Sequence, residues 1–85
     1  MDANDRPVTA RLSPHARQRC LEMHVETKRI KRLLRQPTLT YATYKSRWMA
    51  TSEADPEIAV VYAKSPDGTL DVITVLVRTY DEYQR

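Results

Sequence analysis

Two side chains suited to phosphate chemistry lie four positions apart near the N-terminus, at His15 and Arg19. On a helix, this spacing puts both side chains on one side. An imidazole that titrates near neutral pH suits general acid–base chemistry, and a guanidinium fork matches two phosphate oxygens. The pair is therefore a candidate catalytic site. The structural alternative is that His15 bonds a backbone carbonyl and Arg19 pairs with Glu22.

A second candidate site lies near the C-terminus, where Thr74, Arg78 and Tyr80 share one face of an expected strand. Arg78 would hold a phosphate, and Tyr80 would stack on a base or transfer a proton. This requires a sheet face that no helix covers. The alternative is that Thr74 is an ordinary strand residue and Tyr80 packs at the end of the sheet.

Cations form two further clusters. Within an expected helix over residues 26–35, four of them gather opposite an apolar stripe: Lys28, Lys31, Arg32 and Arg35. They suit a phosphate backbone, or are a solvated helix face. Lys45 and Arg47 beside Tyr44 and Trp48 form a basic–aromatic cluster suited to unpaired bases, unless the tryptophan belongs to the core.

The net charge of +3 conceals a strong asymmetry. Residues 11–35 carry eight Lys/Arg and two Glu, a balance of +6, whereas residues 36–85 carry five Lys/Arg and seven Asp/Glu, a balance of −2. Residues 1–10 contribute −1. A positive charge concentrated in one segment predicts a polyanionic or acidic partner.

The N-terminal half predicts two helices. Ser13 followed by Pro14 is typical of a helix start, and Ala16, Cys20 and Met23 form a stripe over residues 14–24. A second helix over residues 26–35 buries an apolar stripe and ends before Pro37. The stripe consists of Ile30, Leu33 and Leu34.

The remaining chain predicts four strands, over residues 38–44, 47–51, 58–64 and 70–80, with a turn at Ser65–Gly68. The expected fold is therefore α+β, with two N-terminal helices packed on one face of a four-stranded antiparallel sheet. Residues 1–11 are expected to be a flexible segment, and residues 12–85 a single domain.

The last strand is apolar on both faces, which is typical of a central strand. Strict alternation puts Ile73, Val75 and Val77 on one face, and Val72 and Leu76 on the other. Two helices cover one face only. The second face is expected to meet a ligand, the tail 81–85 or a second subunit, which predicts a homodimer through the open sheet face.

Other classes are disfavoured. A single cysteine, Cys20, allows no internal disulfide, and two distant histidines are poor evidence for a metal, so we expect neither metal nor cofactor. The longest apolar stretch, residues 72–77, is too short to span a bilayer, and no secretory signal opens the chain. We therefore expect a cytoplasmic protein with no membrane partner.

Residues 12–80 resemble a family of small bacterial and phage proteins whose first helix carries a Ser-x-His-Ala-x-x-Arg signature, here Ser13 to Arg19. That family is grouped with the barnase, colicin and RelE-like ribonucleases and toxins. The resemblance implies helices on an antiparallel sheet with an RNA site on its exposed face. It also implies that His15 activates a ribose 2′-hydroxyl and that Arg19 stabilises the phosphate. Family members often repeat an arginine one turn after Arg19, where this chain has Met23.

Two functions follow. The first is an RNA-directed, RelE/barnase-like toxin-type domain that acts on RNA or the ribosome, as a metal-independent ribonuclease or growth inhibitor. The alternative is a non-catalytic, phage-type protein that inhibits an acidic host protein through its basic helix or its open sheet face. A helix-turn-helix DNA-binding regulator fits less well, because no third helix is expected.

Overall fold

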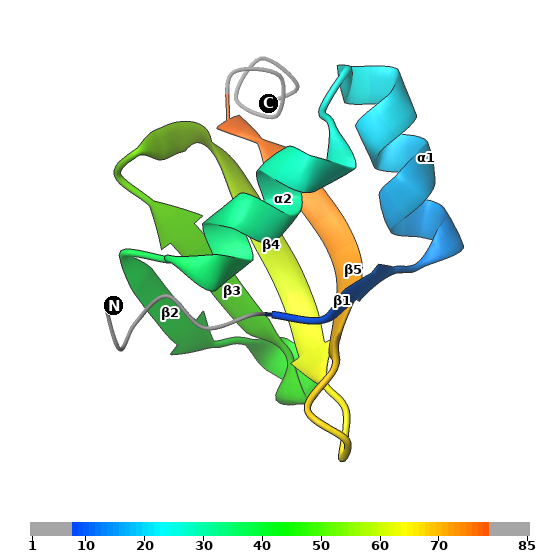
Figure 1. Ribbon diagram of the computed structural model, residues 1–85, viewed down its shortest axis with the longest axis vertical. Helices are drawn as coiled ribbons and strands as arrows, with labels where there is room; N and C mark the ends of the chain where they lie inside the picture. The colour runs from blue at the N-terminus through cyan, green and yellow to red at the C-terminus, as the bar shows by residue number, and fades with distance from the viewer. Residues whose placement is uncertain (1–7, 79–85) are drawn as a thin grey trace.

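A computed structural model of the protein describes residues 8–78. Two helices lie against one face of a five-stranded sheet (Figure 1). The elements in chain order are β1 (Ala10–Leu12), α1 (Pro14–Met23), α2 (Thr27–Arg35), β2 (Leu39–Ala42), a 3-10 turn (Tyr44–Ser46), β3 (Trp48–Ser52), β4 (Asp55–Lys64) and β5 (Leu70–Val77). Within residues 8–78, no helix is long and apolar enough to cross a membrane.

The sheet has the strand order β1-β5-β4-β3-β2, and it is mixed. β1 runs parallel to β5, whereas the other neighbours are antiparallel. The expectation of four antiparallel strands is therefore wrong by one strand, although the α+β class and both helices are confirmed. Ala10 and Arg11, expected in a flexible segment, belong to β1. A strand of three residues is too short to show alternation of apolar and polar side chains in the sequence. β1 forms because it pairs with a strand 60 residues away, at Ala10↔Leu70.

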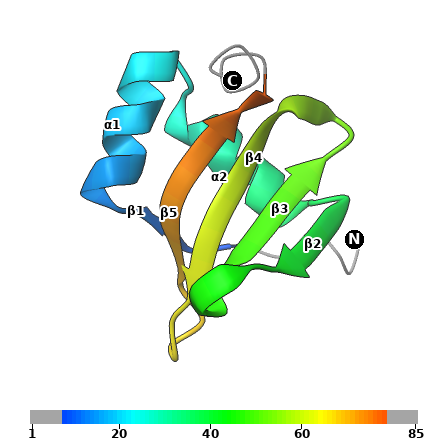
Figure 2. The same cartoon turned by 180° about the vertical axis from the view of Figure 1, so that it is seen from behind.

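The core lies between the helices and one sheet face. From the helices it takes the two stripes that the sequence predicts, with Ala16 and Ile30 at 0% exposure and Cys20 at 5%. The sheet contributes Val60 and Val72, both at 0%. Figure 2 shows the opposite face of β2 to β5, over which none of the described elements passes.

A β-bulge in β5 changes which residues face the core. Thr74 pairs with Val61 while Val72 pairs with Tyr62, so Ile73 is an extra residue. Val72 therefore shares the buried face with Val75, whereas strict alternation had placed it on the other side. Because a bulge inserts one residue, every position before it changes face relative to those after it.

The remaining strand boundaries differ in detail. β4 begins at Asp55 and not at residue 58, because Glu53 and Ala54 form a tight turn where a longer acidic loop was expected. β5 ends at Val77, and Arg78 follows it. Tyr80, expected on the same strand, lies outside the described residues.

Candidate nucleic-acid interface

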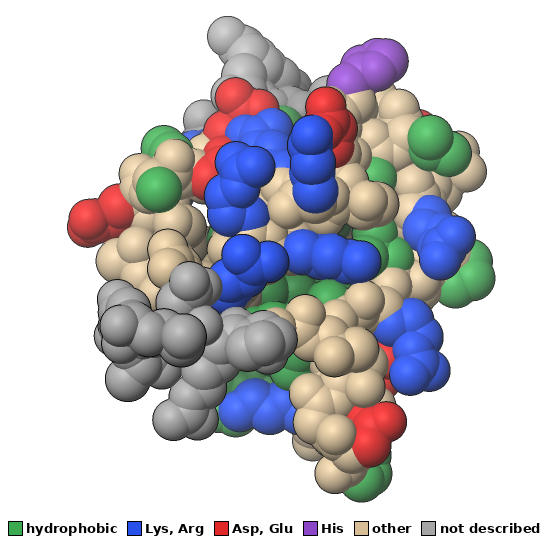
Figure 3. Space-filling model, in the orientation of Figure 1, with side chains coloured by type: hydrophobic (Ala, Val, Ile, Leu, Met, Phe, Trp, Pro, Cys, Tyr) green, Lys and Arg blue, Asp and Glu red, His purple; other side chains and the backbone are tan. Residues whose placement is uncertain are grey.

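Helix α2 presents a row of exposed cations, and we call them the α2 cations: Lys28, Lys31, Arg32 and Arg35. Their spacing of three or four residues places them on one side of the helix. The buried stripe of α2 packs on β3 and β4, so the row points away from the sheet. Figure 3 shows lysine and arginine side chains gathered over this helix. Lys28 also contacts Glu26 at 3.4 Å, an exposed pair that holds neither side chain strongly.

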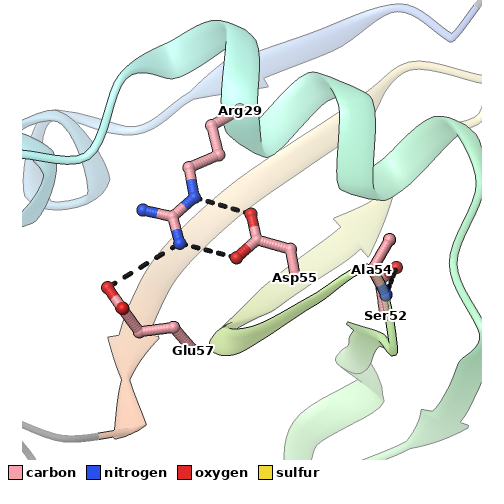
Figure 4. Close-up of polar contacts among 5 residues, drawn as sticks. All are labelled: Arg29, Ser52, Ala54, Asp55 and Glu57. Carbon is pink, nitrogen blue, oxygen red and sulfur yellow. Dashed lines mark hydrogen bonds and ion pairs between the residues drawn. The ribbon is translucent and has the colours of Figure 1, made fainter.

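Arg29 is the exception on this helix, because carboxylates neutralise it. Its Nε and one terminal nitrogen donate to the two oxygens of Asp55, at 2.6 and 2.5 Å (Figure 4). The same nitrogen lies 3.7 Å from Glu57. The hydrogen bonds with Asp55 raise the pKa of Arg29 and lower the pKa of Asp55. Arg29 therefore fastens α2 to the β3–β4 hairpin and leaves the α2 cations to solvent.

We expect Asp55→Asn to destabilise the fold by about 1–2 kcal/mol at pH 7, because the arginine fork loses its charged acceptor. The folded-state pKa of Asp55 lies below the unfolded value, so its stabilisation is present above that unfolded value and is lost as pH falls through the folded one. Urea unfolding of both proteins from pH 7 down to pH 2.5 should show the difference shrinking below about pH 4. An equal difference at every pH would contradict an ionic role.

The two helices leave a groove between them. One depression has Cys20 and Val25 among its lining residues, both 5% exposed, together with Arg17 and Leu21 from α1 and Lys28 from α2. A second depression has Arg11, Arg17 and Lys31 in its lining. Arg17 thus extends the basic surface from α2 onto α1. Arg11 is 3.8 Å from Asp71 and is partly neutralised.

Signature residues near the start of α1 attach this helix to the free edge of β5. The backbone N–H and the hydroxyl of Ser13 donate to the carbonyls of Val72 and Ile73, each at 3.0 Å. Nε of Arg19 donates to the carbonyl of Val75 at 3.0 Å. Since β1 pairs with residues 70–72, the Ser13 N–H adds one bond at the end of that ladder. The Ser13 hydroxyl and the Arg19 Nε bond the carbonyls of Ile73 and Val75 beyond it, where none of the described strands pairs with this edge of β5. Ser13 and Arg19 therefore have a structural role, and Glu22 accepts a hydrogen bond from Gln18.

The proposed catalytic residues do not converge. His15 is exposed on the first turn of α1, beside Ser13 and the Val72–Ile73 level of β5. Arg78 is exposed beyond the other end of β5, roughly 16 Å from Ile73 at the rise of a strand. Thr74 is half-buried on the sheet face opposite the helices. The place of Tyr80 is not described.

The residues of the basic–aromatic cluster between β2 and β3 differ in exposure. Lys45 and Arg47 are exposed, and the Lys45 ammonium is 5.5 Å from the Tyr44 ring centroid. Trp48 is half-buried, and the Lys64 ammonium lies 4.1 Å from its ring centroid. The indole is thus engaged by a cation within the fold. Tyr44, 80% exposed, is the aromatic side chain of this cluster that a base can reach.

Among residues 8–78, no group of three or more His, Cys, Asp or Glu side chains is arranged to hold a metal ion. Cys20 is buried, and burial raises the pKa of its thiol. Comparison with protein-family models, with curated proteins and with solved structures finds no match to this chain. Function must therefore be inferred from the surface itself.

Proposed function

We propose that this domain binds single-stranded RNA through its helical face, with the α2 cations on the phosphate backbone. The observation that carries the proposal is that all four α2 cations are exposed and lie on one side of α2, while Asp55 and Glu57 are turned to Arg29. Arg17 extends the row across the groove. Cations spaced along a helix neutralise successive phosphates without reading bases, so the affinity should not depend on sequence.

RNA is favoured over duplex DNA for two reasons. The chain resembles the RelE/barnase-like group through its Ser13–Arg19 signature. In addition, the described residues contain no third helix beside α1 and α2. Three-helix variants of the helix-turn-helix domain use such a helix to enter the major groove. Binding is favoured over cleavage because His15 and Arg78 lie at opposite ends of β5 and Arg19 bonds a β5 carbonyl.

Fluorescence polarisation with an end-labelled, unstructured 12-nucleotide RNA, between 25 and 300 mM KCl, tests this proposal. Four phosphate contacts at about 0.7 counterions each predict a slope near −3 for log affinity against log salt. Duplex DNA of equal length should compete poorly. A flat salt dependence, or no binding at 25 mM KCl, would contradict the proposal. Denaturing gels of the same samples show whether the RNA is cut, and His15→Ala then shows whether this histidine is required.

A second function, recognition of an acidic protein segment, is favoured by the floor of the interhelical groove. Cys20 and Val25 line it together with Leu21, whose exposure of 73% is large for an apolar side chain. An amphipathic acidic helix would place its apolar face there and its carboxylates on Arg17 and Lys28. Leu21→Ser should weaken such a protein partner and leave RNA affinity unchanged, which separates the two functions in one titration.

A further inference from the structure

The sheet face opposite the helices is built from two cross-strand rows of neutral side chains. Strand pairing aligns the first row as Leu39, Thr51, Ala59 and Leu76. It aligns the second row as Tyr41, Met49, Val61 and Thr74. We call these eight residues the open face, and Figure 2 shows the side of the sheet on which neither described helix lies. Six of them are apolar, two are threonines, and none carries a charge.

The open face is half-buried at its centre and exposed at one side. Leu39 is 56% exposed and Tyr41 43%, both on the edge strand β2. A partner on this face would therefore cover two large, exposed apolar side chains beside a half-buried, uncharged centre. The question is which partner suits it.

Charge distribution favours a second copy of this chain over a polyanion or a charged protein. Two rows without a single charge offer nothing to a phosphate backbone. In a two-fold contact the same patch faces itself, so any charge near the axis would meet its own kind, and a neutral patch avoids this. The α2 cations lie on the other side of the sheet, so two copies joined at their open faces keep those cations apart.

The size of the patch sets the expected strength. Four strands about 4.8 Å apart, with two same-face residues about 6.7 Å apart on each, give a footprint of roughly 250 Å². Specific interfaces bury at least about 500 Å² per partner. The eight residues are thus the centre of a contact whose rim must contribute a similar area. This predicts a dimer that dissociates at roughly 1–100 µM, a range that corresponds to about 5–8 kcal/mol.

We propose that a second copy of this chain covers the open face, forming a two-fold dimer with its RNA-binding helices on the two outer sides. The dimer is independent of the proposed RNA binding, because it uses the opposite face. It would make the particle bivalent, so one long RNA would bind more tightly to the dimer than to each subunit alone.

Sedimentation velocity of the full chain from 2 to 500 µM, at 300 mM KCl and without RNA, tests the proposal. Wild-type mass should rise from one chain to two. Leu76→Asp and Thr74→Arg should each shift the midpoint at least tenfold to higher concentration, and Lys31→Glu, on the other face, should not shift it. Thr74 is polar and only half-buried, so its replacement keeps the test valid if the Leu76 variant unfolds by circular dichroism.

Three results would overturn the proposal. The first is a wild-type protein that stays monomeric at 500 µM. The second is a dimer that both open-face variants retain. The third is a monomeric full chain that dimerises only when it ends at Arg78, since residues 79–85 would then be the occupant. Titration of the same variants with RNA distinguishes failure of the dimer proposal from failure of the proposed RNA binding. Leu76→Asp should not lower the affinity for a 12-nucleotide RNA.

Discussion

Replacing Lys31 and Arg32 by glutamate is expected to weaken the binding of single-stranded RNA. Taking the affinities of variant and wild type as equal at 1 M KCl, the variant should bind about 70-fold more weakly at 50 mM KCl. Both side chains are exposed on the outer side of α2. Each lost phosphate contact removes about 0.7 from the salt slope, and two contacts over 1.3 log units of salt give a change of roughly 1.8 log units. The slope of log affinity against log salt should become shallower, from about −3 to about −1.6. Fluorescence polarisation at five salt concentrations measures both quantities.

A matched control lies on the β2–β3 connection. Lys45→Glu with Arg47→Glu makes the same change in net charge, at exposed positions outside both helices. Non-specific attraction to a basic protein would weaken equally in the two double variants, whereas contact at α2 would weaken mainly in the first. Equal loss in both would remove α2 as the contact surface.

Ala16→Leu is expected to destabilise the domain by about 3 kcal/mol, because overpacking a tight core forces shifts in neighbouring backbone. Ala16 is fully buried on α1, and α1 packs against β5, whose carbonyls Ser13 and Arg19 bond. His15→Ala, one residue earlier and exposed, should change stability by less than about 0.5 kcal/mol. Urea unfolding monitored by Trp48 fluorescence measures both changes.

This pair of variants separates the two roles of the signature. Its alanine and arginine positions have structural roles, whereas the exposed side chain of His15 makes no hydrogen bond or ion pair with another of residues 8–78. A histidine that proved essential for folding would contradict this division. A stable Ala16→Leu protein would show that α1 can move away from β5, and the edge bonds of Ser13 and Arg19 would then be of minor importance.

Local pattern in the sequence was enough to predict both helices and four of the five strands. The Ser13–Pro14 start, the apolar stripes and the halt before Pro37 are short-range signals, and the structure has helices at Pro14–Met23 and Thr27–Arg35. The exposure of the α2 cations followed from the same periodicity. These features depend on residues within about two turns of one another.

What could not be predicted depends on long-range pairing. β1 consists of three residues whose partners are 60 positions away, and nothing in its composition indicates a strand. The bulge at Ile73 turns Val72 toward the core, yet alternation along β5 reads the same with or without it. The Arg29–Asp55 bond joins a helix to a hairpin 26 residues later, and Arg29 at the margin of the basic row gave no sign of it.

The candidate site was harder still to predict, since it requires knowing which face each element turns outward. Thr74 lies on the open face, which the second candidate site requires, but Arg78 follows the strand, and His15 lies near its other end. Trp48 is partnered by Lys64 from a different strand, which spacing within the hairpin cannot reveal.

The most direct test of RNA binding at the helical face is a titration of ¹⁵N-labelled protein with the unstructured 12-nucleotide RNA at 25 mM KCl, followed by two-dimensional NMR. We predict that the largest amide shift changes fall on residues 27–35 and around Arg17, and that 300 mM KCl reverses them. Amides of the open face, such as those of Thr51 and Val61, should stay in place. Shift changes concentrated on the open face, or none at all with saturating RNA, would contradict the assignment of RNA binding to α2.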